Sequence, residues 1–309
     1  MLPITYTVGP LATADDDGIC VSQTTPGAFA LAIGGALSSG YSATSLAASQ
    51  ARGSAGDLTL TAQAANIGGV QVVIASAGND TGITFTVKGM GINYAYESET
   101  LTGSNASLVA TTKQFLSVTA ITASGAAAGN VSAGLSGSTT LDMPRRVIIT
   151  SAGNDSAKTF TIRGTDWNGR TISETVTGAN AGIAQSAYDY KSVTYVAISS
   201  AAAGAVKVGT NGVASSRPII LDSFALAPTA LQADVSGTVN YTIQQSLDNP
   251  AKVGYTSVTW VDHPDTNVVS ATADKQANYA YVPVATRITL NSGTGSVKYT
   301  VIQASGTPV

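Results

Sequence analysis

The sequence predicts an all-β protein, with two tandem copies of an antiparallel β-sandwich-like module and a distinct C-terminal β-sandwich or jelly-roll-like domain. Three observations predict this fold class. A long internal repeat occupies the middle of the chain, and such a repeat is the mark of a duplicated fold unit. Short runs of alternating apolar and polar residues recur along the chain, and no ten-residue stretch has the apolar spacing of an amphipathic helix.

The repeat has an offset of 75 residues and aligns 72–137 with 147–212 without a gap. Thirty of these 66 pairs are identical, and the identities are spread over the whole length. The pentapeptide Ser-Ala-Gly-Asn-Asp occurs in both copies, at 76–80 and 151–155. A catalytic loop is rarely needed twice, whereas a structural loop is needed in every copy of a module. We therefore interpret the repeat as architecture.

Each copy contains a strand centred on a phenylalanine. Residues 84–88 and 159–163 alternate between polar and apolar, which predicts half-buried strands with Phe85 and Phe160 facing the core and the flanking threonines facing the other side. A short β-branched run precedes the pentapeptide in each copy, and Gly, Asn and Asp tolerate positive φ. We therefore predict that the pentapeptide is the turn of a β-hairpin.

Further strands complete each copy. Asn168-Gly169 lies between two strand-like runs and predicts a second hairpin with a type I′ turn. Copy one has Met-Gly-Ile-Asn-Tyr at 90–94 instead, so the turn sequence has diverged. Residues 116–123 and 191–199 predict equivalent strands, each followed by an Ala-Ala-Ala-Gly connection.

A different unit follows the repeat. Val239, Tyr241 and Ile243 alternate with polar residues, residues 257–261 are aromatic and β-branched, and 286–302 reads as a terminal hairpin turning at 292–295. We divide the chain into four parts, which are an N-terminal β segment or arm (1–65), the first module (66–140), the second module (141–216) and the C-terminal β domain (217–309).

The composition argues against nucleic acid and membrane partners. Fifteen basic and eighteen acidic residues give a net charge of −3, and no Lys/Arg run could neutralise several phosphates. The longest apolar stretch, 28–37, is about half the length of a membrane span and contains two glycines. The N-terminus lacks the basic and apolar regions of a secretory signal, so we expect no Sec export.

Histidine and cysteine chemistry has little support. His263 is the sole histidine and no Gly-x-Ser-x-Gly elbow is present, so we interpret it as a loop histidine. Cys20 is the sole cysteine and is expected to be a small buried apolar residue. One histidine and one cysteine exclude a zinc site of the usual kind.

The carboxylate and glycine patterns do not predict a metal, catalytic or phosphate-binding site either. Asp15-Asp16-Asp17 lacks the ligand spacing of a calcium loop and is interpreted as an acidic turn. Glu99 and Glu174 are equivalent through duplication, which favours two strand-face glutamates in separate modules over an acid–base pair. Gly293–Gly295 lacks the features of a phosphate loop. We predict no catalytic, cofactor-binding or metal-binding residue and no cofactor.

Five stretches together resemble a family of virion structural proteins from tailed bacteriophages. They are DGICVSQ (17–23), PRRVIITSAGNDSAKTFTIRGTDWNGRTISETVTGANAG (144–182), GTVNYTIQQSLD (237–248), TWVDH (259–263) and PVATRITLNSGTGSVKYTVIQAS (283–305). The resemblance touches nearly the whole chain, and the doubled middle module departs from it. It implies a non-enzymatic component of the virion that is assembled in the host bacterial cytoplasm.

The leading hypothesis is a head-associated protein, either a capsid decoration or a head-fibre-like projection. It would act by binding other virion proteins, such as the major capsid protein or neck and tail proteins, and particle symmetry favours a homo-oligomer. The alternative is a tail or neck component or a receptor-binding appendage. A third hypothesis, from a different class, is a carbohydrate-binding or carbohydrate-active β-protein that uses Trp167, Trp260 and the tyrosines, although no pair of catalytic carboxylates can be nominated.

Overall fold

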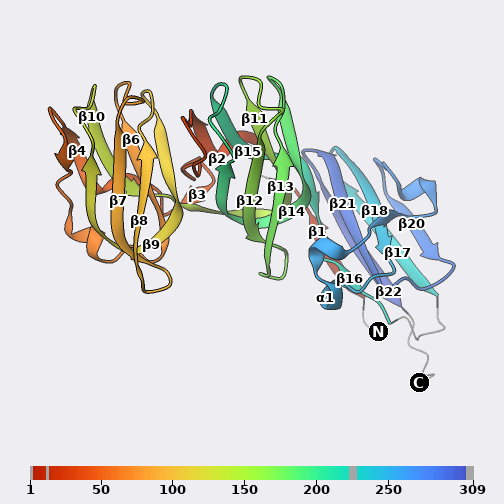
Figure 1. Ribbon diagram of the computed structural model, residues 1–309. Helices are drawn as coiled ribbons and strands as arrows, with labels where there is room; N and C mark the ends of the chain where they lie inside the picture. The colour runs from red at the N-terminus through yellow and green to blue at the C-terminus, as the bar shows by residue number, and fades with distance from the viewer. Residues whose placement is uncertain (1–2, 12–13, 223–227, 304–309) are drawn as a thin grey trace.

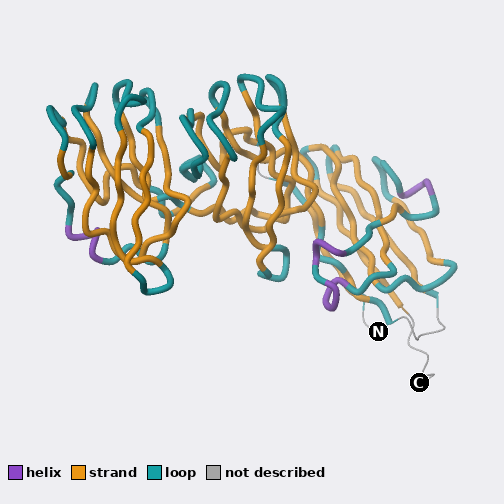
Figure 2. The backbone as a smooth tube through the Cα atoms, in the orientation of Figure 1, coloured by secondary structure: helices purple, strands orange, loops and turns teal. Residues whose placement is uncertain are grey.

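The computed structural model describes residues 3–11, 14–222 and 228–303, which form three β bodies in a row (Figure 1). Strands and loops make up nearly all of the described chain (Figure 2). Its helical segments are short: α1 (Pro250–Val253), η1 (Ala62–Ala65), η2 (Tyr255–Ser257) and η3 (Thr266–Val268). The predicted all-β class, with tandem sandwich-like modules and a C-terminal sandwich, is confirmed.

The first module is a sandwich whose two layers share one long strand. Its strands are β4 (Ser42–Ala51), β5 (Gly56–Asp57), β6 (Val70–Ser76), β7 (Thr84–Gly91), β8 (Tyr96–Thr102), β9 (Leu108–Ala123) and β10 (Asn130–Leu135). They pair antiparallel in the order β4-β10-β6-β9-β7-β8. The first half of β9 pairs with β6, and its second half pairs with β7 and β5. Because β9 belongs to both layers, it fixes how they stack.

The second module repeats this arrangement. Its strands are β11 (Ser138–Ser151), β12 (Thr159–Thr165), β13 (Thr171–Thr177), β14 (Ile183–Ile198) and β15 (Val206–Ser215). Phe85 pairs with Leu101 in the first module, and the equivalent Phe160 pairs with Val176 in the second. Ala106 and Ala181, also equivalent, both have positive φ, at 45° and 46°. The predicted duplication of the fold unit is confirmed.

The C-terminal body is a second kind of sandwich. Its strands are β16 (Ile219–Ile220), β17 (Thr229–Ser236), β18 (Val239–Ser246), β19 (Val261–Asp262), β20 (Lys275–Tyr279), β21 (Ala285–Gly293) and β22 (Ser296–Gln303). One layer has the order β15-β21-β18-β19 and continues the sheet of the second module. The other layer contains β22, β17 and β20. The core between them includes Tyr241 and Tyr299, both fully buried.

The N-terminal segment runs along the whole molecule and adds a strand to every body. Its first strands are β1 (Ile4–Val8), β2 (Asp15–Gln23) and β3 (Ser38–Ser39). β1 pairs with β22 of the C-terminal body, β2 pairs with β15 of the second module, and β4 pairs with β10 of the first. Val8, Cys20 and Leu46 are each fully buried, one in each core. The segment therefore connects the three bodies.

A seam of small side chains joins the two modules. Ala30 forms isolated bridges with both Ala110 and Ala197, and the amide of Leu31 donates to the carbonyl of Val196 at 2.8 Å. Ala30, Ala110 and Ala197 belong to one buried cluster. Small side chains let three backbones approach closely here, which accounts for part of the alanine in the composition.

The predicted pentapeptide hairpin is wrong, although the loops are equivalent. β6 pairs with β9 and β10, whereas β7 pairs with β8 and β9, so the loop between β6 and β7 crosses from one layer to the other. Asp80 and Asp155 are buried, and their Oδ1 atoms accept hydrogen bonds from the amides of Ala128 (2.7 Å) and Ala203 (2.9 Å). The motif is conserved between the copies of the module because its aspartate holds a second loop.

Of three further predictions, one hairpin is confirmed, whereas the terminal hairpin and one strand are wrong. β12 and β13 form the predicted Asn-Gly hairpin, but only Gly169 has positive φ (76°), so the turn is not type I′. The predicted terminal hairpin is wrong because β21 and β22 lie in different sheets. The predicted strand at 257–261 is also wrong, since only β19 at its end is extended.

Replacing Phe85 or Phe160 with Ala should each lower the free energy of unfolding of its module by about 3–5 kcal/mol. Both rings are fully buried, whereas Thr86 on the opposite face of β7 is partly exposed. Denaturant unfolding followed for each module gives the measurement. The control Thr86→Ala loses a hydrogen bond with the Thr100 hydroxyl and some β propensity, and should change stability by about 1 kcal/mol or less. A phenylalanine variant that behaves like this control would contradict the assigned core face.

Candidate functional site

His263 is a buried structural histidine in the loop after β19. Its side chain is 4% exposed, and its ring centroid lies 4.6 Å from that of Tyr279. Its Nδ1 accepts a hydrogen bond from the amide of Asp265 at 3.0 Å. Burial lowers the pKa of His263, although the nearby Asp265 acts in the opposite direction. A ring packed in this way stabilises a loop and is poorly placed to transfer protons to a substrate.

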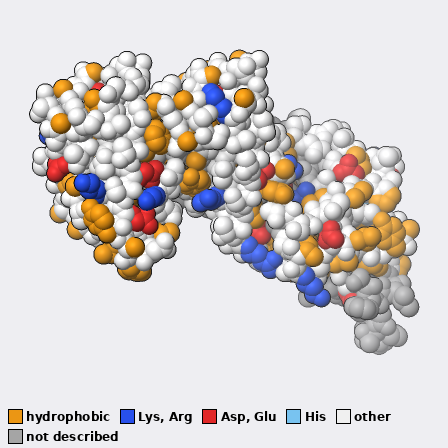
Figure 3. All heavy atoms as spheres, viewed as in Figure 1, with side chains coloured by type: hydrophobic (Ala, Val, Ile, Leu, Met, Phe, Trp, Pro, Cys, Tyr) orange, Lys and Arg blue, Asp and Glu red, His pale blue; other side chains and the backbone are white. Residues whose placement is uncertain are grey.

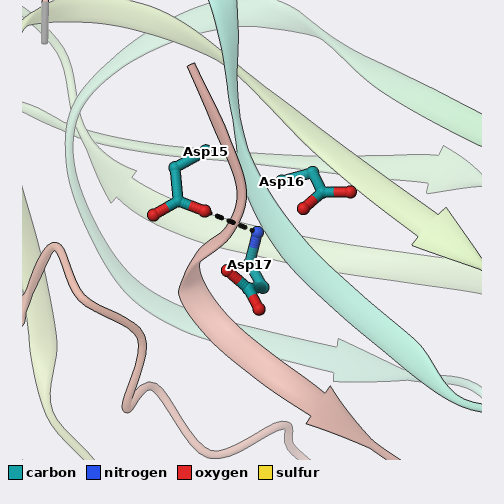
Figure 4. Close-up of side chains that lie close together, drawn as sticks. All are labelled: Asp15, Asp16 and Asp17. Carbon is teal, nitrogen blue, oxygen red and sulfur yellow. Dashed lines mark hydrogen bonds between the residues drawn. The ribbon is translucent and has the colours of Figure 1, made fainter. Parts of the chain in front are cut away.

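The three N-terminal aspartates lie at the start of β2, not in a turn, and their carboxylates are close together (Figure 4). Within the described residues they form the one group of three potential metal ligands, with ligand atoms within 4.8 Å of one another. The amide of Asp17 donates to Oδ1 of Asp15, and the side-chain hydrogen bond with Asp15 raises the pKa of Asp17. Lys207 forms an ion pair with Asp16. The cluster is thus partly neutralised by the chain itself.

Cys20 is buried, as predicted from its residue type, and it lies in the core of the second module. It is fully buried, and burial raises the pKa of its thiol. A buried neutral thiol behaves as a small apolar side chain and is inaccessible to reactants.

Glu99 and Glu174 lie in separate modules, where each anchors an edge strand. The two carboxylate oxygens of Glu99 accept hydrogen bonds from the amides of Thr112 and Lys113, both at 2.8 Å. Glu174 accepts from the amide of Ala187 at 2.8 Å, and burial raises the pKa of Glu174. These amides lie at irregularities in the β6–β9 and β11–β14 ladders, where the pairing register shifts. The glutamates therefore satisfy backbone donors that the ladder leaves free.

The two tryptophans do not form a shared sugar-stacking platform. The guanidinium of Arg217 lies 4.7 Å from the Trp167 ring centroid, and that of Arg287 lies 4.3 Å from the Trp260 ring centroid. One face of each indole is therefore covered by a cation. Trp260 lines a small hollow of about 230 Å³, while Trp167 lies in the β12–β13 hairpin.

The sequence did not predict a buried ionic cluster that lies at the junction of the second module and the C-terminal body. Asp189, 1% exposed, accepts hydrogen bonds from Nε of Arg146 at 2.7 Å and from the Ser215 hydroxyl at 2.8 Å. Arg287 of the C-terminal body also donates to it, at 3.4 Å. The four residues come from β11, β14, β15 and β21, so only the fold brings them together. The cluster joins two bodies through a paired charge.

A broad hollow lies on the outer face of the C-terminal sheet formed by β22, β17 and β20. It measures about 580 Å³ and is lined by neutral amides and hydroxyls, such as Gln232, Gln276, Asn278 and Thr300, and by the apolar Ile302. Asp265 is its one charged lining residue, and none of its lining side chains is aromatic. It thus offers hydrogen bonds across a broad, shallow surface.

Exposed apolar side chains gather at the β7–β8 hairpin of the first module. Met90, Ile92, Tyr94 and Tyr96 are 42%, 47%, 80% and 69% exposed. Apolar side chains are visible at the lower end of this module in Figure 3. The signal in the sequence is Met-Gly-Ile-Asn-Tyr-Ala-Tyr, four large apolar residues around a turn, where a polar loop is usual. Such a concentration on a surface is typical of an interaction site.

Comparison with protein-family models, with curated proteins and with solved structures found no match. None of the helices in the described ranges has the length and apolar character that a membrane crossing requires.

Acidification should destabilise the C-terminal body through His263. Its pKa in the folded protein lies below the ordinary value of 6.5, so its contribution to stability is complete above pH 6.5 and is lost as pH falls towards the lowered pKa. His263→Phe should abolish this part of the pH dependence. Thermal unfolding from pH 7.5 to 5 measures the difference. Identical pH profiles for the two proteins would show that His263 is not held in its neutral form.

Proposed function

We propose that the protein is a non-enzymatic structural component of a tailed-bacteriophage virion, associated with the head as a capsid decoration or a fibre-like projection. The single observation that supports it most is the N-terminal segment, which contributes paired strands and buried side chains to three successive β bodies. Such a segment ties the three bodies into one elongated unit. This is the mechanical requirement of a projecting or surface-bound particle protein.

The roles of the residues that could carry chemistry support the non-enzymatic part of the proposal. His263 packs on Tyr279, Cys20 is enclosed in a core, and Glu99 and Glu174 bind backbone amides. Each of these groups already has a structural task. In a catalytic site, by contrast, an acid, base or nucleophile faces a cleft that admits substrate.

A tail or neck component remains the second candidate because the same extended form suits both positions. Quantitative mass spectrometry of purified virions should detect this chain, with its copy number measured against the major capsid protein. Hundreds of copies are expected for a decoration, whereas about six or twelve would indicate the neck or tail. Absence of the chain from purified virions would refute the proposal.

A further inference from the structure

The β7–β8 hairpin tip, defined by Met90, Ile92, Tyr94 and Tyr96, has an internal counterpart that reveals how this element is used. The offset of 75 places Ile92 at the position of Trp167. The two turns are built alike, since the amide of Tyr94 donates to Gly91 (3.0 Å) as that of Gly169 donates to Asp166 (3.1 Å). The same hairpin therefore occurs twice in different surroundings.

In the second module this hairpin is a docking element. Arg170 donates hydrogen bonds to the carbonyls of Pro250 (3.2 Å) and Ala251 (2.9 Å) in the C-terminal body. Trp167 is partly buried and lies under the guanidinium of Arg217. Among the residues that the structure describes, the hairpin of the first module makes none of these contacts, and its four apolar side chains are exposed.

The first hairpin differs from its counterpart in the residues that make the contact. Ala95 stands at the position of Arg170, and Gly91 at that of Asp166, so the tip from Met90 to Tyr96 carries no charge. Tyr94 stands at the position of Gly169 and has a φ of 58°, a left-handed conformation that residues other than Gly, Asn and Asp rarely adopt. The chain thus keeps a large aromatic residue, 80% exposed, at a position where glycine would be unstrained. Strain at an exposed aromatic residue points to a binding role.

Pairing through the neighbouring strand edge is disfavoured. β8 lies at the end of its sheet, but Glu99 binds two amides of β9, and the ammonium of Lys113 donates to the carbonyl of Ser98 at 3.0 Å. The ammonium of Lys113 thus occupies one backbone carbonyl of β8, and the Glu99 side chain holds this strand against β9. A partner therefore meets the side chains of the tip and not an open row of backbone groups.

We propose that the hairpin tip binds the same tip of a second copy of this chain, forming a two-fold symmetric contact. An uncharged apolar tip is complementary to itself, because apposing two copies buries apolar surface without leaving a charge unpaired. Tyrosine suits such a contact because it offers a large apolar area at low entropic cost.

The size of the patch sets the strength of the contact. At the exposed fractions given above, the four side chains present on the order of 500 Å², so a symmetric pair would bury on the order of 1,000 Å². This is the low end for specific interfaces, and a reversible, concentration-dependent dimer is the result. Inside an array of many copies, such weak contacts add up through multivalency.

Analytical ultracentrifugation of the full chain over a concentration range of about a hundredfold tests the proposal. The wild-type protein should shift from monomer to dimer. Tyr94→Gly should weaken dimerisation by at least about tenfold while remaining folded, since glycine is the residue that the equivalent turn of the second module uses. Ile183→Thr, which removes another exposed apolar side chain (62%) far along the chain, is the matched control and should dimerise like wild type.

A cysteine variant tests the geometry. Asn93 is exposed at the tip and Cys20 is fully buried, so Asn93→Cys adds one accessible thiol and should give a disulfide-linked dimer on mild oxidation, whereas Ile183→Cys should not. A wild-type monomer throughout the range, equal dimerisation of Tyr94→Gly and wild type, or dimers that do not cross-link through residue 93 would each overturn the proposal. None of these results depends on whether the protein belongs to a virion, which the mass spectrometry decides separately.

Discussion

The architecture depends on the N-terminal segment, whose strands pair with strands of all three bodies that come later in the sequence. β1 gives Val8 to the C-terminal core, β2 gives Ile19 and Cys20 to the second module, and β4 gives Leu46 to the first. Without these strands each body would expose an unpaired edge and part of its core. Contacts between residues so distant in sequence are expected to form late in folding, because the loop-closure entropy must be overcome first.

In each module, two loops that cross between the layers are hydrogen-bonded to each other. The aspartate of each Ser-Ala-Gly-Asn-Asp loop binds an amide of the Ala-Ala-Ala-Gly connection, so two loops at one end of the sandwich hold each other. In the second module Lys158 also pairs with Asp155 at 2.6 Å. Burial raises the pKa of Asp155, but its hydrogen bonds with Lys158 and Ala203 outweigh this effect, so the pKa is lowered overall. Both modules therefore use a buried aspartate to bind the amide of a second loop, and the second module adds the charge of Lys158.

The two copies of the module keep the same core residues and differ in the residues that make external contacts. Residues that maintain the sandwich, such as Phe85 and Phe160, are identical because each core requires them. The hairpin tips differ because one faces the C-terminal body and the other faces solvent. Arg170 with its carbonyl partners and Tyr94 with its strained backbone lie at neighbouring positions of the same hairpin in the two copies.

The sequence by itself determined the fold class, the duplication and the inward face of the central strands. Side-chain periodicity depends only on neighbouring residues, and an internal repeat is found by aligning the chain with itself. It also determined that Cys20 would be a buried apolar residue. It could not determine strand partners, since a Gly-Asn-Asp loop between two strands suits either a hairpin or a crossing between layers. The tertiary structure decided these partners, together with the Asp189 cluster and the exposure of Tyr94, because each depends on packing between segments far apart in the chain.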